Sequence, residues 1–244
     1  MNLLQRNIYV GIVTAAGYSE KSGIHYTERL KGLIDAIVLS TELSRDQKNN
    51  LLVMGGESNF LFRLNGETGQ LVWVEPADWQ LPEVATWTDE DINKLLDIGQ
   101  TILTSLKNKM ALPAHIIRKQ RGVGLVPLPG QKMCREELEE VVLNAQRGIE
   151  VTEVAKRINF CAFNGGTDVW VDIGDKRFGV MSLQRYLGGI PARRALHVGD
   201  QFASVGANDF KARLAACTVW IASPKETVDI VDELVQYIDE GTVE

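Results

Sequence analysis

A chain of 244 residues is long enough for one large or two small domains, and its 45% hydrophobic and 24% charged residues are ordinary for a globular protein. The formal net charge of -6 argues against nucleic acid as the main partner, because phosphate backbones attract basic surfaces. No stretch approaches the ~20 apolar residues that cross a membrane, and the first residues show no signal-peptide pattern. We therefore expect a cytoplasmic protein with neither nucleic acid nor a membrane as a partner.

The N-terminal part is predicted to begin with a short apolar strand, Asn7 to Val13, that runs into the turn Thr14-Ala15-Ala16-Gly17-Tyr18. A helix over Tyr26 to Leu39 and a second short strand over Leu51 to Met54 follow. Phe60 to Val74 then alternates around a Gly-containing turn, which predicts a β-hairpin.

The middle of the chain mixes strands and helices without a repeating order. Thr88 is predicted to cap a helix that runs to about Met110, because acidic residues fill its first turn and complement the helix dipole. A strand over Arg121 to Leu128 and a charged helix over Arg135 to Arg147 follow. No regular strand-helix alternation is visible between about Gly55 and Ala155.

From Asn159 onward, apolar strands and helices alternate, which is typical of a parallel sheet with crossover helices. After a first apolar strand, the predicted elements are a helix over Phe178 to Leu187, a strand over Ala195 to Val198, a helix over Asp209 to Ala215, a strand over Cys217 to Ala222 and a helix over Thr227 to Tyr237. We expect an α/β fold: a core built from residues 1–55 and 156–244, with an α+β insert over residues 56–155.

Polar residues stand at the ends of several predicted strands. Thr14 ends the first strand, where its hydroxyl and the following N–H groups can bind a phosphate oxygen. Lys176 precedes a helix and could neutralise a transferring phosphoryl group. Asp200 follows a strand and Asp209 opens the next helix, at the edge where open α/β sheets bind ligands. Carboxylates at that edge suit Mg²⁺. Each residue taken alone also has a purely structural explanation: Thr14 as an ordinary residue at the end of a strand, Lys176 as a solvated lysine in a turn, and the acids as caps of a helix.

The order of hydroxyl, lysine and paired acids is more specific than any one of these elements. It matches motifs two, three and four of the haloacid dehalogenase superfamily of phosphotransferases. Longer strings resemble the IMP-specific 5′-nucleotidase family over essentially the whole chain. They are Val13 to Tyr18, Met54-Gly55-Gly56-Glu57-Ser58-Asn59, Lys119-Gln120-Arg121-Gly122-Val123-Gly124, Phe163-Asn164-Gly165-Gly166, Asp168-Val169-Trp170-Val171-Asp172-Ile173-Gly174, Gly206 to Ala215 and Thr218 to Pro224.

The resemblance implies Mg²⁺-dependent hydrolysis of inosine 5′-monophosphate (IMP) by a Rossmann-like haloacid dehalogenase core with an inserted α+β cap. Carried over by position, Thr14 would bind the substrate phosphate and Lys176 would secure the phosphoryl group beside the nucleophile. Asp200 would complete the Mg²⁺ site, and Asp209 would support the loop. Asp168 matches a position of the family that contacts the nucleotide, but it could equally be an ordinary turn residue after Gly165-Gly166. The family further implies regulation by ATP and a homo-oligomer in the full-length protein.

The superfamily's first motif, Asp-x-Asp-x-Thr after a strand, is not found in this chain. Its first Asp attacks phosphorus, and the second protonates the leaving oxygen and then activates water. No acid precedes Thr14. We therefore expect the C-terminal portion of such an enzyme, with a core that lacks its nucleophile strand beside Asn7 to Val13 and that is inactive alone.

Two alternatives remain open from the sequence. The Asp200 to Asp209 loop also resembles that of phosphomannomutases, which would transfer the phosphoryl group to a sugar phosphate. A chain without a nucleophile could instead be a non-catalytic module that binds a nucleotide or phosphate. A substrate panel distinguishes the phosphomannomutase alternative from the nucleotidase by comparing IMP hydrolysis with mannose-phosphate isomerisation. Calorimetric titration with IMP and Mg²⁺ tests the binding module, which would bind the nucleotide without hydrolysing it.

Overall fold

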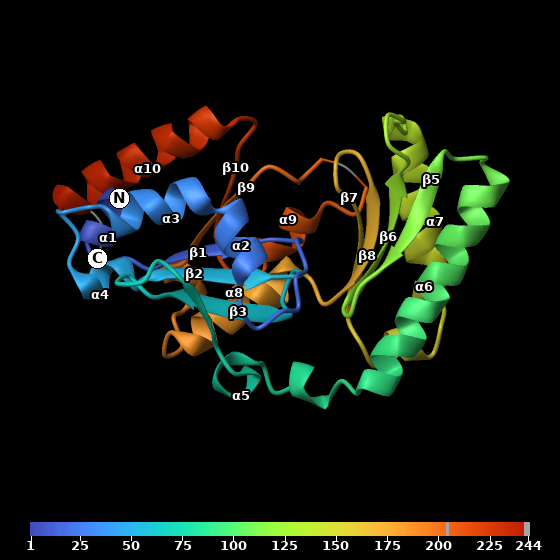
Figure 1. Ribbon diagram of the computed structural model, residues 1–244, viewed down its shortest axis with the longest axis horizontal. Coiled ribbons are helices and arrows are strands. Elements are labelled where there is room, and N and C mark those ends of the chain that lie inside the picture. Colours follow the sequence, from blue (N-terminus) through green and yellow to red (C-terminus); the bar gives the residue numbers. More distant parts are fainter. Residues whose placement is uncertain (204, 242–244) are drawn as a thin grey trace.

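The computed structural model describes residues 1–203 and 205–241, which form two lobes with a mixed α/β fold (Figure 1). The first lobe holds strands β1–β4, β9 and β10, and the second holds β5–β8 with the long helices α6 and α7. Within the described ranges, no helix combines the length and the apolar character that a membrane crossing requires.

The larger sheet of the first lobe has the spatial order β1-β2-β3-β4. Its strands are β1 (Val10–Val13), β2 (Leu51–Gly55), β3 (Phe60–Leu64) and β4 (Leu71–Trp73). β1 and β2 run parallel, whereas β3 and β4 form the antiparallel hairpin that the alternation predicts. β2 is buried along its whole length, because it is apolar on both faces and has a strand on each side.

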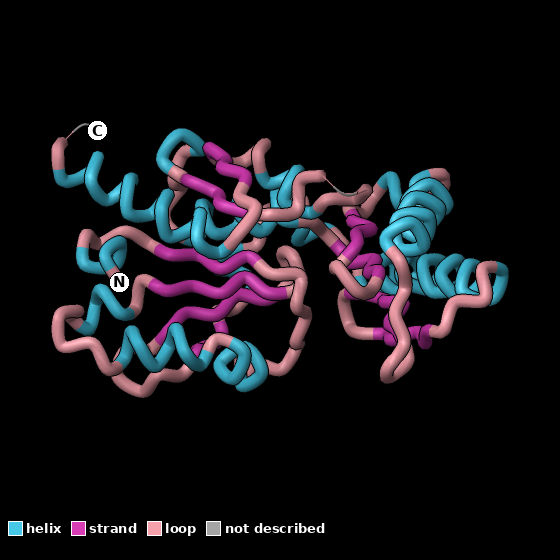
Figure 2. The backbone as a smooth tube through the Cα atoms, turned by 90° about the horizontal axis from the view of Figure 1, so that it is seen from above, coloured by secondary structure: helices cyan, strands magenta, loops and turns pink. Residues whose placement is uncertain are grey.

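A separate parallel pair, β9 (Leu196–Gly199) and β10 (Cys217–Trp220), confirms the parallel arrangement for the last two of the strands predicted from Asn159 onward (Figure 2). Helix α8 (Lys176–Tyr186) connects this pair to the larger sheet. Val13 of β1 and Ala195, just before β9, both pack against the cluster that contains Val180 of α8.

The remaining elements of the first lobe are mostly short. They are α1 (Asn2–Gln5), α2 (Ile24–Arg29), α3 (Lys31–Val38), α4 (Arg45–Lys48), α5 (Pro76–Trp79), η1 (Val84–Thr86), η3 (Ala192–Arg194), α9 (Asn208–Ala212) and α10 (Pro224–Asp239). The single helix predicted over Tyr26 to Leu39 is divided at Leu30, whose backbone (φ -101, ψ 13) leaves the helical region. The N-terminal turn reaches α10 through a pair of hydrogen bonds between the Arg6 guanidinium and the Asp239 carboxylate.

The second lobe is an antiparallel sheet in the order β5-β6-β8-β7, covered on one face by α6 (Asp89–Lys109) and α7 (Arg135–Glu150) (Figure 1). Its strands are β5 (Ala114–Arg118), β6 (Gly122–Pro127), β7 (Phe160–Asn164) and β8 (Val169–Ile173), and η2 (Val154–Lys156) precedes β7. Alternate strand residues such as Val123, Leu125 and Val171 pack beneath the helices. Their neighbours in the strands, Gly122, Gly124 and Asp172 among them, point to the opposite face.

The predicted domain boundaries are wrong at both ends of the insert. Residues 60–73 belong to the first sheet through β3 and β4, and residues 160–173 belong to the second through β7 and β8. Alternating apolar residues indicate a strand with one buried face but do not say which sheet receives it. The connection between lobes therefore lies near 74–88 on one side and 174–175 on the other. Residues 204 and 242–244, which the predicted core range includes, lie outside the described residues.

Tyr26 ties the turn after β1 to the larger sheet. Its hydroxyl donates to the Ala16 carbonyl oxygen at 2.6 Å and accepts from the Tyr18 amide at 2.9 Å. We expect Tyr26→Phe to lower the free energy of unfolding by about 1–2 kcal/mol, because two partly buried backbone groups lose their hydrogen-bond partner. Urea unfolding measures this change, with the exposed Tyr9→Phe as the unaffected control. Equal stability of the Tyr26 variant and the unaltered protein would contradict the prediction.

Candidate functional site

Asp209 is the centre of a polar cluster at the edge of the first lobe. Its carboxylate, 1% exposed, accepts hydrogen bonds from Lys176 Nζ at 2.7 Å and from the Gln201 amide at 2.9 Å, and it lies 3.1 Å from His197 Nε2. Burial opposes ionisation of the Asp209 carboxyl, but the hydrogen bonds and the Lys176 charge outweigh it and hold its pKa well below the usual range. Asp209 is therefore ionised, and its carboxylate holds the Lys176 ammonium group, the His197 ring and the Gln201 amide in place.

Lys176 is positioned by the start of α8. Asp175 caps this helix, since its carboxylate accepts from the Phe178 amide at 3.1 Å, and the Lys211 ammonium lies 3.3 Å from the same carboxylate. Lys176 follows directly, with 12% of its side chain exposed. A helix N-terminus and an ammonium group both attract anions, so this corner of the site suits a phosphate.

Thr14 lies at the end of β1 and is connected to α9 through Glu57. The Thr14 amide donates to the Met54 carbonyl oxygen at 2.9 Å, and its own carbonyl oxygen accepts from the Glu57 amide at 2.9 Å. Glu57, buried and in the left-handed region (φ 65), accepts at Oε1 from Asn208 Nδ2 at 2.9 Å. The turn after β1 and the start of α9 are therefore held together by one buried carboxyl group.

Asp200 follows β9 and is exposed, directly before Gln201, whose amide binds Asp209. Over residues 1–203 and 205–241, no group of three His, Cys, Asp or Glu side chains is arranged to hold a metal ion. Mg²⁺ is nevertheless usually held by only one or two carboxylates, and it takes its other ligands from substrate phosphate and water. Asp200 fits that role as a single ligand.

Asp168 lies apart from these residues, in the turn between β7 and β8 of the second lobe. Its carbonyl oxygen accepts from the Gly165 amide at 2.9 Å, and Asn164 Oδ1 accepts from the Gly166 amide at 2.8 Å. The structure thus gathers Thr14, Lys176, Asp200 and Asp209 on the first lobe. The nucleotide contact implied for Asp168 stays a prediction.

Sequence reasoning missed several buried polar residues at the site. Glu57, Asp172 and His197 were not singled out, although each shows a signal: a polar side chain within an apolar strand or shortly after one. Burial raises the pKa of Glu57 to about 7 and raises that of Asp172 well above its usual range. Only the three-dimensional structure shows that Glu57 and Asp172 lie close enough to interact, and that His197 lies beside Asp209.

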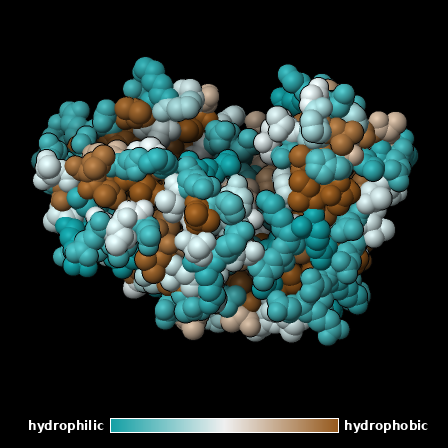
Figure 3. Space-filling model, in the orientation of Figure 1, coloured by the Kyte–Doolittle hydropathy of each residue, from teal (hydrophilic) through white to brown (hydrophobic). Residues whose placement is uncertain are grey.

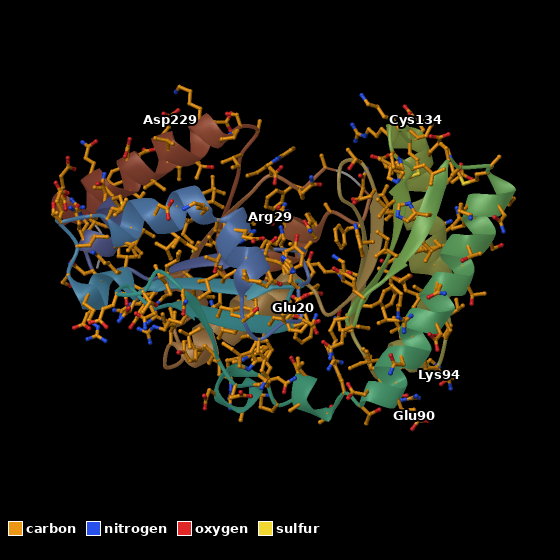
Figure 4. The ribbon with its side chains drawn as sticks, in the orientation of Figure 1. Glu20, Arg29, Glu90, Lys94, Cys134 and Asp229 are labelled. Carbon is orange, nitrogen blue, oxygen red and sulfur yellow. The ribbon has the colours of Figure 1, made fainter. Side chains whose placement is uncertain are left out.

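The two lobes meet at the site, where side chains of both point into the space between them, with Glu20 at its edge (Figure 4). The outline of the molecule is notched at this junction (Figure 3). A small cavity there is lined by Ala15 and Gly17 of the first lobe and by Lys119 and Asp172 of the second. A neighbouring cavity of about 240 Å³ has Trp73 and other aromatic side chains in its wall.

Glu57 makes the stability of the chain sensitive to pH. Because its pKa is raised on folding, the folded state holds a proton that the unfolded state releases, and stability falls as pH rises from about 4.3 toward 7. We expect Glu57→Gln, whose oxygen can still accept from Asn208, to remove this fall and to be ~1–3 kcal/mol more stable than the unaltered protein above pH 7. Urea unfolding at pH 5 and pH 8 measures it. A stability difference that is the same at both pH values would contradict the prediction.

Comparisons with known proteins point to one group. A family model described as IMP-specific 5′-nucleotidase matches residues 1–231. The IMP-specific 5′-nucleotidase 1 of Yarrowia lipolytica is 59% identical over 239 residues, which are 98% of this chain and 57% of that protein. Among solved structures, an IMP-bound mutant of Plasmodium falciparum IMP-nucleotidase superposes with a TM-score of 0.82 at 31% identity, over 96% of this chain and 61% of that one. The ATP-bound form superposes with a TM-score of 0.78 at 33% identity, over 93% of this chain and 51% of that one. The chain therefore spans little more than half the length of the proteins it matches.

Proposed function

This chain belongs to the IMP-specific 5′-nucleotidase family, and from that membership we propose that it supplies the phosphate-binding part of an enzyme that hydrolyses IMP to inosine and phosphate. The observation that carries this proposal is the buried Lys176–Asp209 pair at the start of α8, beside the end of β1. The ammonium group is held there by a fixed anion and faces the edge where Thr14 and Asp200 also lie.

The substrate phosphate is bound by Lys176 and by the Thr14 hydroxyl, which accepts from the Ala16 amide at 3.1 Å and donates its own proton to a phosphate oxygen. Asp209 positions Lys176, and His197 in turn supports Asp209. Asp200 is the carboxylate that would hold Mg²⁺, and the bound ion would neutralise charge on the phosphoryl oxygens. These groups stabilise the charge that develops as the phosphoryl group is transferred.

The open edges of β1 and β9 support a haloacid dehalogenase core with one further strand. Every residue of β1 is at least partly exposed, whereas β2 beside it is buried throughout, and Leu196 at the start of β9 is 42% exposed. Strands of parallel sheets are normally buried between neighbours. A strand from outside these 244 residues, pairing with β1 and β9, would close the sheet and end at the rim that carries Thr14 and Asp200. The greater length of the relatives allows for it.

That strand would carry the two carboxylates that the chemistry requires. The first attacks phosphorus and forms an acyl phosphate, while the bond from phosphorus to the 5′ oxygen of inosine breaks and the second carboxylic acid protonates that oxygen. The second carboxylate then takes a proton from water, which attacks phosphorus and releases phosphate from the first. Lys176 remains beside the phosphoryl oxygens through both steps and lowers the cost of their charge.

Phosphate release from IMP in the presence of Mg²⁺ tests the proposal. We expect the complete native gene product to hydrolyse IMP and the 244 residues alone to release no phosphate. Hydrolysis by the 244 residues at the full rate would overturn the assignment of the nucleophile to a further strand.

Calorimetric binding of IMP without hydrolysis by the complete protein would favour a non-catalytic module, and mannose-phosphate isomerisation would favour the phosphomannomutase alternative. Parallel assays with ATP test the regulation that the ATP-bound relative suggests.

A further inference from the structure

β7 lies at the edge of the second sheet, yet all five of its residues are buried. Directly before the strand, the Asn159 carbonyl oxygen accepts from the Gly174 amide, on the side of β8, at 2.8 Å. Carbonyl groups alternate in direction along a strand, so those of Phe160 and Ala162 point away from β8. Edge strands carry such unpaired backbone groups, which proteins often cover with a helix or a loop. For β7 the cover comes from the first lobe.

Gly206, in the turn before α9, packs directly on this edge. A Cβ atom at Gly206 would overlap the Ala162 carbonyl oxygen and would lie 2.8 Å from Val142 Cγ1 on α7. The residue also has a left-handed backbone (φ 70), which favours glycine. Glycine is therefore required at this position both for the turn and for the close approach of the two lobes.

Lys211 makes a second contact with the same edge. Its Nζ donates to the Phe160 carbonyl oxygen at 3.4 Å and lies 3.3 Å from Asp175 Oδ2. Asp175 is 2% exposed, and its other carboxylate oxygen caps α8 at the Phe178 amide. An ammonium group has three N–H donors, so it can serve both acceptors at once. Lys211 of α9 thus joins β7 of the second lobe to the start of α8.

The two helices joined at Lys211 are those that carry the ion pair of the phosphate site. Lys176 directly follows Asp175 and begins α8, and Asp209 lies two residues before Lys211 on α9. Lys176 Nζ and Asp209 Oδ1 are 2.7 Å apart. A shift of α9 away from β7 would therefore move Asp209 relative to Lys176. Because Asp175 and Phe160 already engage the Lys211 ammonium group, Lys211 acts on the ion pair through α9 and not by binding substrate.

Resting on the proposed function, we propose that Lys211 is a positioning residue for phosphoryl transfer. Together with Gly206 it holds α9 on the free edge of β7, and the second lobe thereby keeps Asp209 and Lys176 in the geometry that receives the phosphoryl group. The coupling is reciprocal, as linked equilibria must be. Displacement of the second lobe loosens the phosphate site, and a filled phosphate site holds the second lobe in place.

Steady-state kinetics of the complete native protein with IMP measure the effect on the reaction. We expect Lys211→Met to lower kcat by about 10- to 100-fold and to change KM less, because a small displacement caused far from the reacting atoms can cost that much in rate. Lys211→Arg, whose guanidinium can reach both acceptors, should keep most of the activity. Lys31→Met removes a lysine paired with Asp35 on α3 and is the control, which should have no effect.

Gly206→Ala disturbs the same contact without altering any charge. It should lower kcat as Lys211→Met does, because the added Cβ atom pushes α9 away from the Ala162 carbonyl oxygen. Gly130→Ala is the matched control, since Gly130 has a similar left-handed backbone (φ 77) but none of the described residues lies within 4 Å of an added Cβ atom. Both alanine variants strain the backbone, and only Gly206→Ala separates the lobes.

The distance between the lobes is a readout that a purely local role of Lys211 would not change. Cys134 of the second lobe (Figure 4) and Cys217 of the first are exposed, whereas Cys161 is buried. Spin labels on the two exposed cysteines, with cysteines outside these 244 residues replaced by serine, report the distances by pulsed electron resonance. We expect a narrow distribution in the unaltered protein and in Lys211→Arg, and a broader or longer one in Lys211→Met and Gly206→Ala. Inorganic phosphate should narrow the broad distributions, because the coupling is reciprocal.

The outcomes separate this inference from the proposed function. Unchanged kcat in both Lys211→Met and Gly206→Ala would overturn the inference, and so would a lowered kcat with an unchanged distance distribution, since the lobes would then not be involved. A loss of activity that Lys211→Arg does not restore would contradict the role of the positive charge. These outcomes leave the proposed function standing. Failure of the unaltered complete protein to hydrolyse IMP would overturn the proposed function, while the distance distributions would still show whether Lys211 joins the lobes.

Discussion

Replacing Lys176 with methionine is expected to lower kcat/KM for IMP by about 10²–10³-fold in the complete native protein, the usual effect of removing one preorganised group that stabilises developing charge. Methionine keeps the length and apolar character of the stem but cannot neutralise phosphoryl oxygens. The ammonium group is already fixed at 2.7 Å from Asp209 and needs little reorganisation when substrate binds. Initial rates of phosphate release over a range of IMP concentrations measure the effect.

Two further variants show whether the loss belongs to the ammonium group itself. Lys225→Met on α10 removes a lysine whose side chain is 81% exposed and should leave kcat/KM unchanged. Lys176→Arg keeps the positive charge and should retain more activity than Lys176→Met. Full activity of Lys176→Met would refute the placement of the phosphate at the start of α8.

Replacing Asp209 with alanine is expected to lower the free energy of unfolding by about 3–5 kcal/mol, because the Lys176 ammonium group would remain nearly buried without its partner. The change would also leave His197 and the Gln201 amide without their shared acceptor. Urea unfolding at pH 7 measures it. Asp229→Ala, which removes an exposed carboxylate on α10 (Figure 4), is the control and should change stability by less than ~1 kcal/mol.

The stability that Asp209 contributes should depend on pH in a defined direction. The pKa of its carboxyl is lowered on folding, so the contribution is complete above the unfolded value of about 3.9 and is lost as pH falls below it. The unaltered protein should therefore lose stability between pH 5 and pH 3 more steeply than Asp209→Asn does. Parallel urea titrations at these pH values compare the two, and equal slopes would contradict the ion pair as the cause.

Much of the secondary structure could be predicted from local signals. The helix expected from Thr88 to Met110 is α6, Asp89–Lys109, and the Thr88 hydroxyl accepts from the Asp91 amide at 3.1 Å as a cap should. The hairpin over Phe60 to Val74 was equally clear, because it combines alternation with a glycine turn. In both cases the interactions that form the element, a helix cap and a tight turn, are made by residues close together in the sequence.

The assignment of strands to sheets could not be predicted in this way. β3 and β4 read as part of the insert, yet they join the first sheet, while β7 reads as the start of the parallel core, yet it pairs with β8 in the second. A strand's partners lie far away in the chain, and its own alternation records only that one of its faces is buried. The domain boundaries failed for that reason.

The sequence by itself determined which polar residues stand just after a strand, Thr14 and Asp200, and which stand at the start of a helix, Lys176 and Asp209, because both patterns are local. It also determined the family to which the chain belongs. The tertiary structure alone decided that Glu57 joins the turn after β1 to α9, and that Lys211 of α9 reaches β7 of the second lobe. These contacts bring together residues far apart in the chain, and burial and electrostatics between them arise only when the lobes are assembled.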